Sequence, residues 1–198
     1  MTYYSGKDLA RSFRVVRKNT LQIANEIPDT GYAYRATPDT RTVGEILAHI
    51  AAGSRWHQVA NGVEKKTSLA AEDFGRYMQD AHAQETALKT KADVIAALEK
   101  NGAEFAAWLE SLDDDVLGQL VTLPAGADPA QKTRFELLMG VKEHEMHHRA
   151  QIMMAQRLLG MVPHLTRERE ARFAARKNPG TTGTTGTTGT TGTEWPER

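Results

Sequence analysis

Helix-start signals are the feature of this sequence that most restricts its fold. Four times, a serine or threonine is followed three residues later by an acidic residue, so that hydroxyl and carboxylate can bind the free amides of a helix's first turn. Behind each pair, apolar residues recur at helical spacing. The pairs are Ser5/Asp8, Thr42/Glu45, Thr90/Asp93 and Thr133/Glu136, and they predict helices near residues 6–27, 43–60, 91–111 and 134–159.

The links between these helices indicate how they are connected. About thirty residues separate the second helix from the third, which is long enough to cross the end of a bundle. Phe74, Tyr77 and Met78 predict a helical turn within this link. Alternating apolar residues are confined to residues 121–123, so a sheet has little support. We therefore expect an all-α four-helix bundle with a long crossover between helices two and three.

The chain changes character after the fourth helix. Gly160 suits a left-handed helix cap and Pro163 blocks continuation, so residues 1–165 are expected to form the bundle. Residues 166–178 are locally basic and are expected to form a short, solvated C-terminal helix. Residues 179–198 consist largely of Gly-Thr-Thr repeats, a low-complexity tail that cannot bury a core.

Composition excludes several classes of partner. Lys plus Arg and Asp plus Glu number 25 each, so no net charge attracts nucleic acid or a membrane surface. No apolar run is long enough for a signal peptide or a membrane span, and we expect a cytoplasmic protein. Cysteine is absent, so any metal must be held by His, Asp or Glu.

Histidines on the fourth predicted helix point to such a metal. His144 and His148 are four residues apart and therefore lie on one helix face. The apolar stripe formed by residues 137, 141, 152, 155 and 159 continues through both positions. Burying two unpaired imidazoles would cost about 1–3 kcal/mol each, which a divalent cation would avoid. His49, at the edge of the second helix's apolar stripe, is the predicted third ligand, whereas His57, His82, His147 and His164 are not expected to bind metal.

Three histidine ligands leave at least one coordination position open, which is typical of catalytic metal centres. Two further side chains stand one turn from the predicted ligands. Glu45 could orient His49, although helix capping is its favoured role, and Gln151 could orient His148.

Two segments resemble the DinB-like (DinB/YfiT) superfamily. They are residues 42–50, Thr-Val-Gly-Glu-Ile-Leu-Ala-His-Ile, and residues 144–152, His-Glu-Met-His-His-Arg-Ala-Gln-Ile. The resemblance implies a four-helix bundle with a crossover, commonly a homodimer, in which His49, His144 and His148 hold zinc or nickel, with iron and manganese as alternatives. It also implies a small-molecule substrate and, for some members, a low-molecular-weight thiol used in transfer reactions.

Two alternatives stay open at this point. The chain could bind metal without turnover, as a stress-response protein. Residues 144–148 also spell His-Glu-x-x-His, the signature of zinc peptidases in which the glutamate, here Glu145, is the general base. Glu168 or Glu170 would then supply the third ligand.

Overall fold

The computed structural model describes residues 4–177, and it contains the four predicted helices. Each begins where its capping pair predicts, with the hydroxyl accepting from the third backbone amide and the acid accepting from the cap amide. These helices are α1 (Gly6–Glu26), α2 (Val43–Gln58), α4 (Lys91–Glu110) and α6 (Arg134–Leu158). A 3₁₀ turn, η1 (Asp29–Ala33), follows α1, and a π-helical turn, η2 (Val59–Val63), continues α2.

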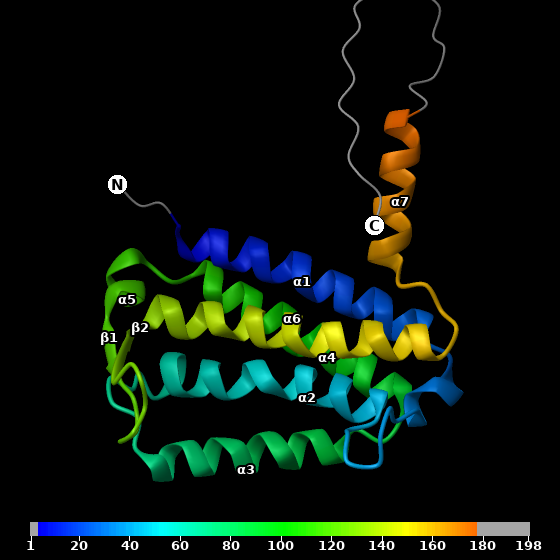
Figure 1. Cartoon of the computed structure of the whole chain (residues 1–198). Coiled ribbons are helices and arrows are strands. Elements are labelled where there is room, and N and C mark those ends of the chain that lie inside the picture. Colours follow the sequence, from blue (N-terminus) through cyan, green and yellow to red (C-terminus); the bar gives the residue numbers. More distant parts are fainter. Residues whose placement is uncertain (1–3, 178–198) are drawn as a thin grey trace, which may run out of the picture.

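The four helices form a bundle in which α1 packs on α4, α4 packs on α2, and α6 lies against both α1 and α2 (Figure 1). α2 and α4 run in the same direction: Asn101 donates to the Ala51 carbonyl, and one turn further along both helices Arg55 pairs with Glu104. Two consecutive bundle helices that run parallel need a connection that returns along the bundle's full length. The predicted crossover is therefore confirmed.

This crossover is a helix and not the expected turn. α3 (Ala71–Ala87) runs antiparallel to α2 and packs along it (Figure 1). The predicted helical turn at Phe74, Tyr77 and Met78 is part of this helix, but the helix is longer than predicted because the usual signals are weak here. Ala70 precedes the helix and has no capping hydroxyl, so only Asp73 contributes, accepting from the Ala70 amide at 3.2 Å. Tyr77 and Ala81 are the buried residues of α3, too few to produce a clear helical period.

The other connections are short. α5 (Asp114–Gly118) follows α4, and β1 (Leu120–Thr122) pairs antiparallel with β2 (Gln131–Thr133) in a small hairpin at one end of the bundle. Residues 121–123, the strand-like stretch of the sequence, overlap β1, whereas β2 was not predicted.

The basic segment after the bundle forms α7 (His164–Lys177), which points away from the other helices (Figure 1). Its side chains are mostly exposed, in agreement with a solvated helix. The Gly-Thr-Thr tail at 179–198 lies outside the described residues, and the division at residues 165 and 178 stays a prediction. Among the described helices, none has the length and apolarity needed to cross a membrane.

A buried ion pair crosses the bundle core. Arg17 on α1 donates to both carboxylate oxygens of Glu145 on α6, at 2.9–3.1 Å, and to the Leu98 carbonyl at 2.7 Å. The two side chains are only 5% and 2% exposed. Because both charges are removed from water, each depends on the other for compensation, so this pair fixes how α6 is turned against α1.

Candidate metal centre

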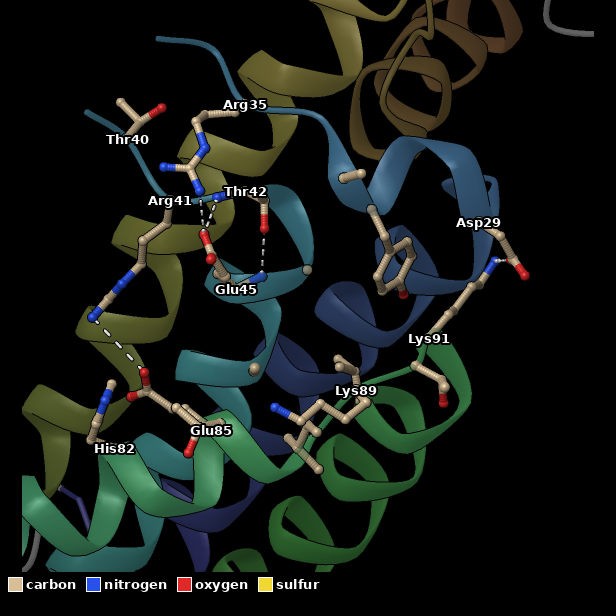
Figure 2. A pocket seen from close by; sticks show the side chains of 18 of the residues that line it. Asp29, Arg35, Thr40, Arg41, Thr42, Glu45, His82, Glu85, Lys89 and Lys91 are labelled. Carbon is tan, nitrogen blue, oxygen red and sulfur yellow. Dashed lines mark hydrogen bonds and ion pairs between the residues drawn. The ribbon is translucent and has the colours of Figure 1, made fainter. Parts of the chain in front are cut away.

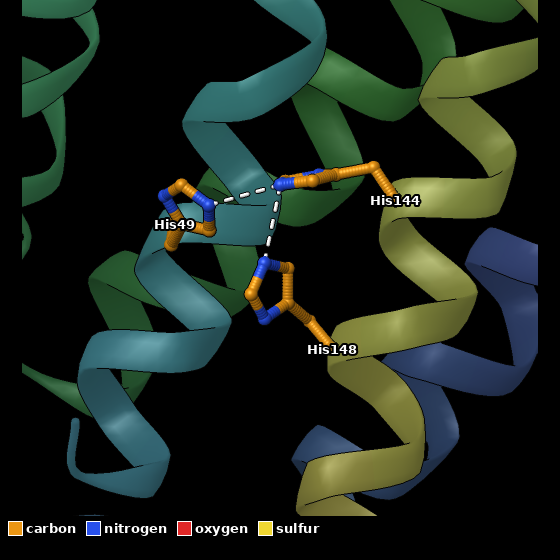
Figure 3. Close-up of side chains that lie close together, drawn as sticks. All are labelled: His49, His144 and His148. Carbon is orange, nitrogen blue, oxygen red and sulfur yellow. Dashed lines mark hydrogen bonds between the residues drawn. The ribbon is translucent and has the colours of Figure 1, made fainter. Parts of the chain in front are cut away.

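The three predicted histidines meet between α2 and α6 (Figure 3). His144 Nε2 lies 3.0 Å from His49 Nε2 and 3.1 Å from His148 Nε2. A ligand atom from each of the three lies within 4.8 Å of the other two. Helix spacing brings His144 and His148 together, as predicted, and the antiparallel packing of α2 on α6 brings His49 to them.

The two measured distances between these nitrogens are close to those around a divalent ion. At metal–nitrogen distances of about 2.0–2.1 Å, two tetrahedral ligands stand about 3.3–3.4 Å apart and two ligands at a right angle about 3.0 Å. The observed 3.0 and 3.1 Å separations fall at the lower end of this range. Small side-chain rotations would therefore adapt the cluster to either coordination geometry.

Two ring orientations are fixed from outside the cluster. Glu85 Oε1, on α3, lies 2.6 Å from His49 Nδ1, and Gln151 Oε1 lies 2.9 Å from His148 Nδ1. An ionised carboxylate only accepts hydrogen bonds, so His49 carries a proton on Nδ1, and the neutral ring, the form that binds a metal, presents its Nε2 lone pair to the cluster. The Gln151 oxygen selects the same tautomer of His148. The predicted contact of Gln151 with His148 is thus present.

With these tautomers, the three Nε2 atoms of the cluster have too few protons to form hydrogen bonds with one another. Lone pairs of His49 and His148 both point at His144 Nε2, and one proton on that nitrogen can form a good hydrogen bond with only one of them. Two nitrogen lone pairs facing each other without a proton or cation repel. A metal ion between the rings would satisfy all three nitrogens together.

Glu45 does not orient His49. Its carboxylate accepts from the Thr42 amide at 2.6 Å and pairs with Arg35 at 3.2 Å, so it has the capping role. The orienting carboxylate is Glu85, which sequence reasoning missed because α3 was not predicted. Partial burial opposes its ionisation, but the hydrogen bond from His49 and the charges of His49 and Arg41 outweigh burial and lower the pKa of Glu85.

The predicted position of the histidines within the core was wrong. Val141, Ile152 and Ala155 of the predicted stripe are buried, but the other buried positions in the first half of α6 include Leu138 and Glu145, each one residue after the predicted positions 137 and 144. Charged Glu145 occupies the core position because Arg17 compensates it. His144 is therefore exposed, and His49 and His148 are half-buried, so the cluster lies at the flank of the bundle and opens toward solvent.

Electrostatics keep the exposed cluster ready to bind a cation. Although the His144 side chain reaches solvent, the packing of protein around part of its ring, together with the neighbouring histidines and Arg41, lowers the pKa of His144 to about 4. Burial also lowers the pKa of His148, against the opposing hydrogen bond to Gln151. Both rings are therefore neutral at pH 7, the form in which imidazole binds metals.

Beside the cluster lies a polar cavity of about 820 Å³ between the start of α2, the end of α3 and the start of α4 (Figure 2). Glu85 lies on its wall. Arg41 reaches toward Glu85 from the loop before α2, at 3.9 Å (Figure 2). Arg41 thus links the cavity electrostatically to the histidines, a role with no sequence signal because it depends on α3.

The remaining histidines lie outside the cluster, as predicted. His147 is exposed on the neighbouring face of α6, where its Nε2 lies 3.3 Å from the Gln151 amide nitrogen. His164 is buried at the start of α7 near Asn19. His82 lies on the wall of the polar cavity, and His57 lines a second cavity.

Fold and cluster together define a class of protein, the crossover four-helix bundle with three histidines shared between its second and last long helices. The sequence model of the DinB superfamily matches residues 12–152. The chain belongs to the DinB superfamily, which confirms the resemblance of its two histidine segments. No curated protein matches the chain.

Solved structures with the same fold come from Bacillus subtilis. The DinB-like protein YjoA aligns with a TM-score of 0.57 and 21% identity over 78% of this chain and 93% of its own. YfiT aligns with a TM-score of 0.60 and 16% identity over 81% of this chain and 91% of its own. YfiT is described as a probable metal-dependent hydrolase with an unusual four-helix bundle topology. At these identities the two likenesses support the fold alone.

Proposed function

We propose that His49, His144 and His148 hold one divalent metal ion and that this centre activates a nucleophile for attack on a small electrophilic substrate. The observation that carries the proposal is the convergence of three Nε2 atoms. Glu85 and Gln151 orient the His49 and His148 rings so that their Nε2 lone pairs face His144, and one cation between the rings would bind all three nitrogens. Zinc and nickel suit an all-imidazole ligand set, with iron and manganese as alternatives.

Three neutral ligands leave a bound divalent ion with its full charge and an open position, so the ion would lower the pKa of a water or thiol bound there. The protein's own residues set what else is available. Arg41, whose charge lowers the pKa of both His144 and His148, adds a positive potential that favours an anionic nucleophile. The open, solvent-facing side of the cluster leaves space for a small substrate.

The carboxylates nearest the cluster are poorly suited to act as general bases. Glu85 accepts from His49, and Glu145 is turned into the core toward Arg17. Without a base, a nucleophile that ionises readily is favoured: a free thiol has a pKa of about 8.5, far below that of water. Because the chain has no cysteine, that thiol would come from a separate low-molecular-weight compound. We therefore favour metal-dependent thiol transfer.

Two other functions are alternatives that the experiments below distinguish from thiol transfer. Hydrolysis, the activity suggested for YfiT, would use water in place of the thiol. A stress-response protein that binds metal without turnover would need the same three ligands. The peptidase alternative loses support because Glu145, its general base, is only 2% exposed and bound to Arg17, while Glu168 and Glu170 lie on the outward-pointing α7.

Metal content tests the first part of the proposal. Elemental analysis of the protein as purified is expected to give about one divalent ion per chain, and His144→Ala should lose it. His147→Ala is the matched control, because that imidazole lies three residues away on the same helix but outside the cluster. Equal metal content in wild type and His144→Ala would contradict the proposal.

A thiol titration tests the second part. In cobalt-substituted protein, a bound thiol is expected to add an intense near-ultraviolet absorption. The loaded protein should accelerate arylation of the thiol by 1-chloro-2,4-dinitrobenzene, which releases chloride. Neither effect should occur in His144→Ala. Hydrolysis of p-nitrophenyl acetate without any thiol effect would favour the hydrolase, and no turnover with either substrate would favour the non-catalytic function.

The proposal also includes a homodimer, which the family resemblance implies, and a cytoplasmic location, which we expect from the sequence. Light scattering on the eluting protein tests the dimer, and cell fractionation tests the location.

A further inference from the structure

A second cavity, of about 430 Å³, lies toward the hairpin end of the bundle, between α2, α3, α6 and the loop that joins β1 to β2. Its walls are mainly apolar. Phe74 on α3 is 44% exposed although its ring meets Trp56 edge-on at 5.9 Å, so an aromatic surface is left uncovered here. The apolar lining comprises Trp56, Leu69, Phe74, Leu123, Pro124 and Leu137, and we call this cavity the apolar pocket.

The apolar pocket begins one helical turn from the histidine cluster. Its wall includes Gly140, four residues before His144 on α6. It also includes His57, eight residues after His49 on α2, and Gly53 lies between them, where a Cβ would stand 3.5 Å from the His144 ring. Four residues of helix span about 6 Å. Because Gly53 and Gly140 have no side chains, these two positions do not fill the space between the cluster and the apolar pocket.

Three residues of this wall carry polar side chains, Lys132, Glu136 and His57, and His57 has a buried nitrogen. Its Nδ1 is buried and has no hydrogen-bond partner within the described part of the chain. Burial, with a smaller effect of His144, lowers the pKa of His57 to about 3, so the ring is neutral and can donate or accept. A buried polar nitrogen without a partner is unfavourable, and a rotation of the His57 ring toward the pocket would let a ligand supply that partner.

We propose that the apolar pocket binds an aromatic or branched aliphatic group of the substrate while the reactive end of the molecule lies at the three-histidine centre. His57 would form a hydrogen bond with a polar substituent on the group that occupies the pocket. This inference rests on the proposed function, to which it adds the class of substrate. A concave, mostly apolar pocket with few polar groups beside reactive residues is the usual form of a small-molecule site.

Paired hydroxamates test the proposal, since both bind a metal through the same group. Benzohydroxamate should bind zinc-loaded protein roughly ten- to a hundredfold more tightly than acetohydroxamate, the gain expected from burying a phenyl ring. Gly140→Leu should fill the pocket and reduce this ratio to about twofold or less, leaving acetohydroxamate binding and zinc content unchanged. Gly75→Leu is the matched control, because Gly75 is exposed on α3 with no atom near its Cβ position.

A second measurement does not depend on the metal. Toluene titrated into zinc-free protein should shift the amide NMR signals of His57 and Gly140, and should not do so in Gly140→Leu. Failure of zinc binding with these shifts intact would overturn the proposed function and leave the apolar pocket standing. Toluene shifts elsewhere, or a hydroxamate ratio near one in wild type, would overturn the assignment of the pocket.

His57 is tested with a pair of probes that differ by one hydroxyl group. His57→Phe should weaken benzyl alcohol binding at least threefold relative to toluene, because the ring nitrogen is lost while the aromatic surface stays. An unchanged ratio of the two affinities would remove His57 from the proposal.

Discussion

Removing the Glu85 charge should weaken metal binding without weakening the bundle. In wild type, the 2.6 Å contact with Oε1 holds the proton of His49 on Nδ1 and leaves Nε2 free. Glutamine at this position can donate as well as accept, so Glu85→Gln would let the Nε2-protonated tautomer compete. Loss of such an orienting carboxylate typically costs 10- to 100-fold in metal affinity, or about 1.4–2.7 kcal/mol. We expect Glu85→Ala to cost at least as much.

Glu45→Gln provides the control within the same family of substitutions. Glu45 is one turn before His49 but accepts from the Thr42 amide, a bond that the glutamine oxygen can also accept, so this substitution should lower the free energy of unfolding by less than about 1 kcal/mol and leave zinc affinity unchanged. Competition with a chromophoric chelator at pH 7.5 measures the affinity, and urea denaturation measures the stability. Equal zinc affinities in wild type and Glu85→Gln, or a larger loss in Glu45→Gln, would refute the assigned role of Glu85.

Three further predictions concern stability. Glu145→Gln should lower the free energy of unfolding by about 3–5 kcal/mol, because Arg17 would stay buried without its counter-charge. The double variant Arg17→Met/Glu145→Leu should recover most of the lost stability, as measured by urea denaturation. A single variant as stable as wild type would contradict the importance of the pair. Gly6→Ala should cost about 1–3 kcal/mol, since its Cβ would lie 2.4 Å from the Leu109 carbonyl oxygen, while Gly118→Ala, with open space, should be close to neutral. The metal-free protein should lose thermal stability as the pH falls from about 6.5 to about 4, because in that window the unfolded chain protonates His144 and the folded chain does not; a His144→Gln variant with the same pH slope would disprove this.

Local chemistry explains which parts of the structure could be predicted from sequence. A helix start depends on residues three positions apart, so Ser5, Thr42, Thr90 and Thr133 reveal all four bundle helices. The His144 and His148 pair is also local, because four residues make one helical turn.

Features that depend on distant residues were missed. Arg17 and Glu145 are 128 residues apart. Without knowledge of that pair, a charged residue is not expected in the core, so the prediction placed His144 there instead of Glu145. Glu85 is 36 residues from His49, on a helix whose N-cap residue, Ala70, has no hydroxyl group. No sequence pattern around position 85 distinguishes this glutamate from those that are exposed.

The helix that closes the crossover has a consequence for how such chains can vary. A protein with α3 trimmed to a plain loop would retain the ion pair between Arg17 and Glu145, most of the bundle core and all three imidazoles. It would lose the carboxylate that sets one tautomer and, with Phe74, a wall of the space beside the histidines. Length and helicity between the second and third bundle helices could therefore separate reactive members of this architecture from those that merely capture an ion.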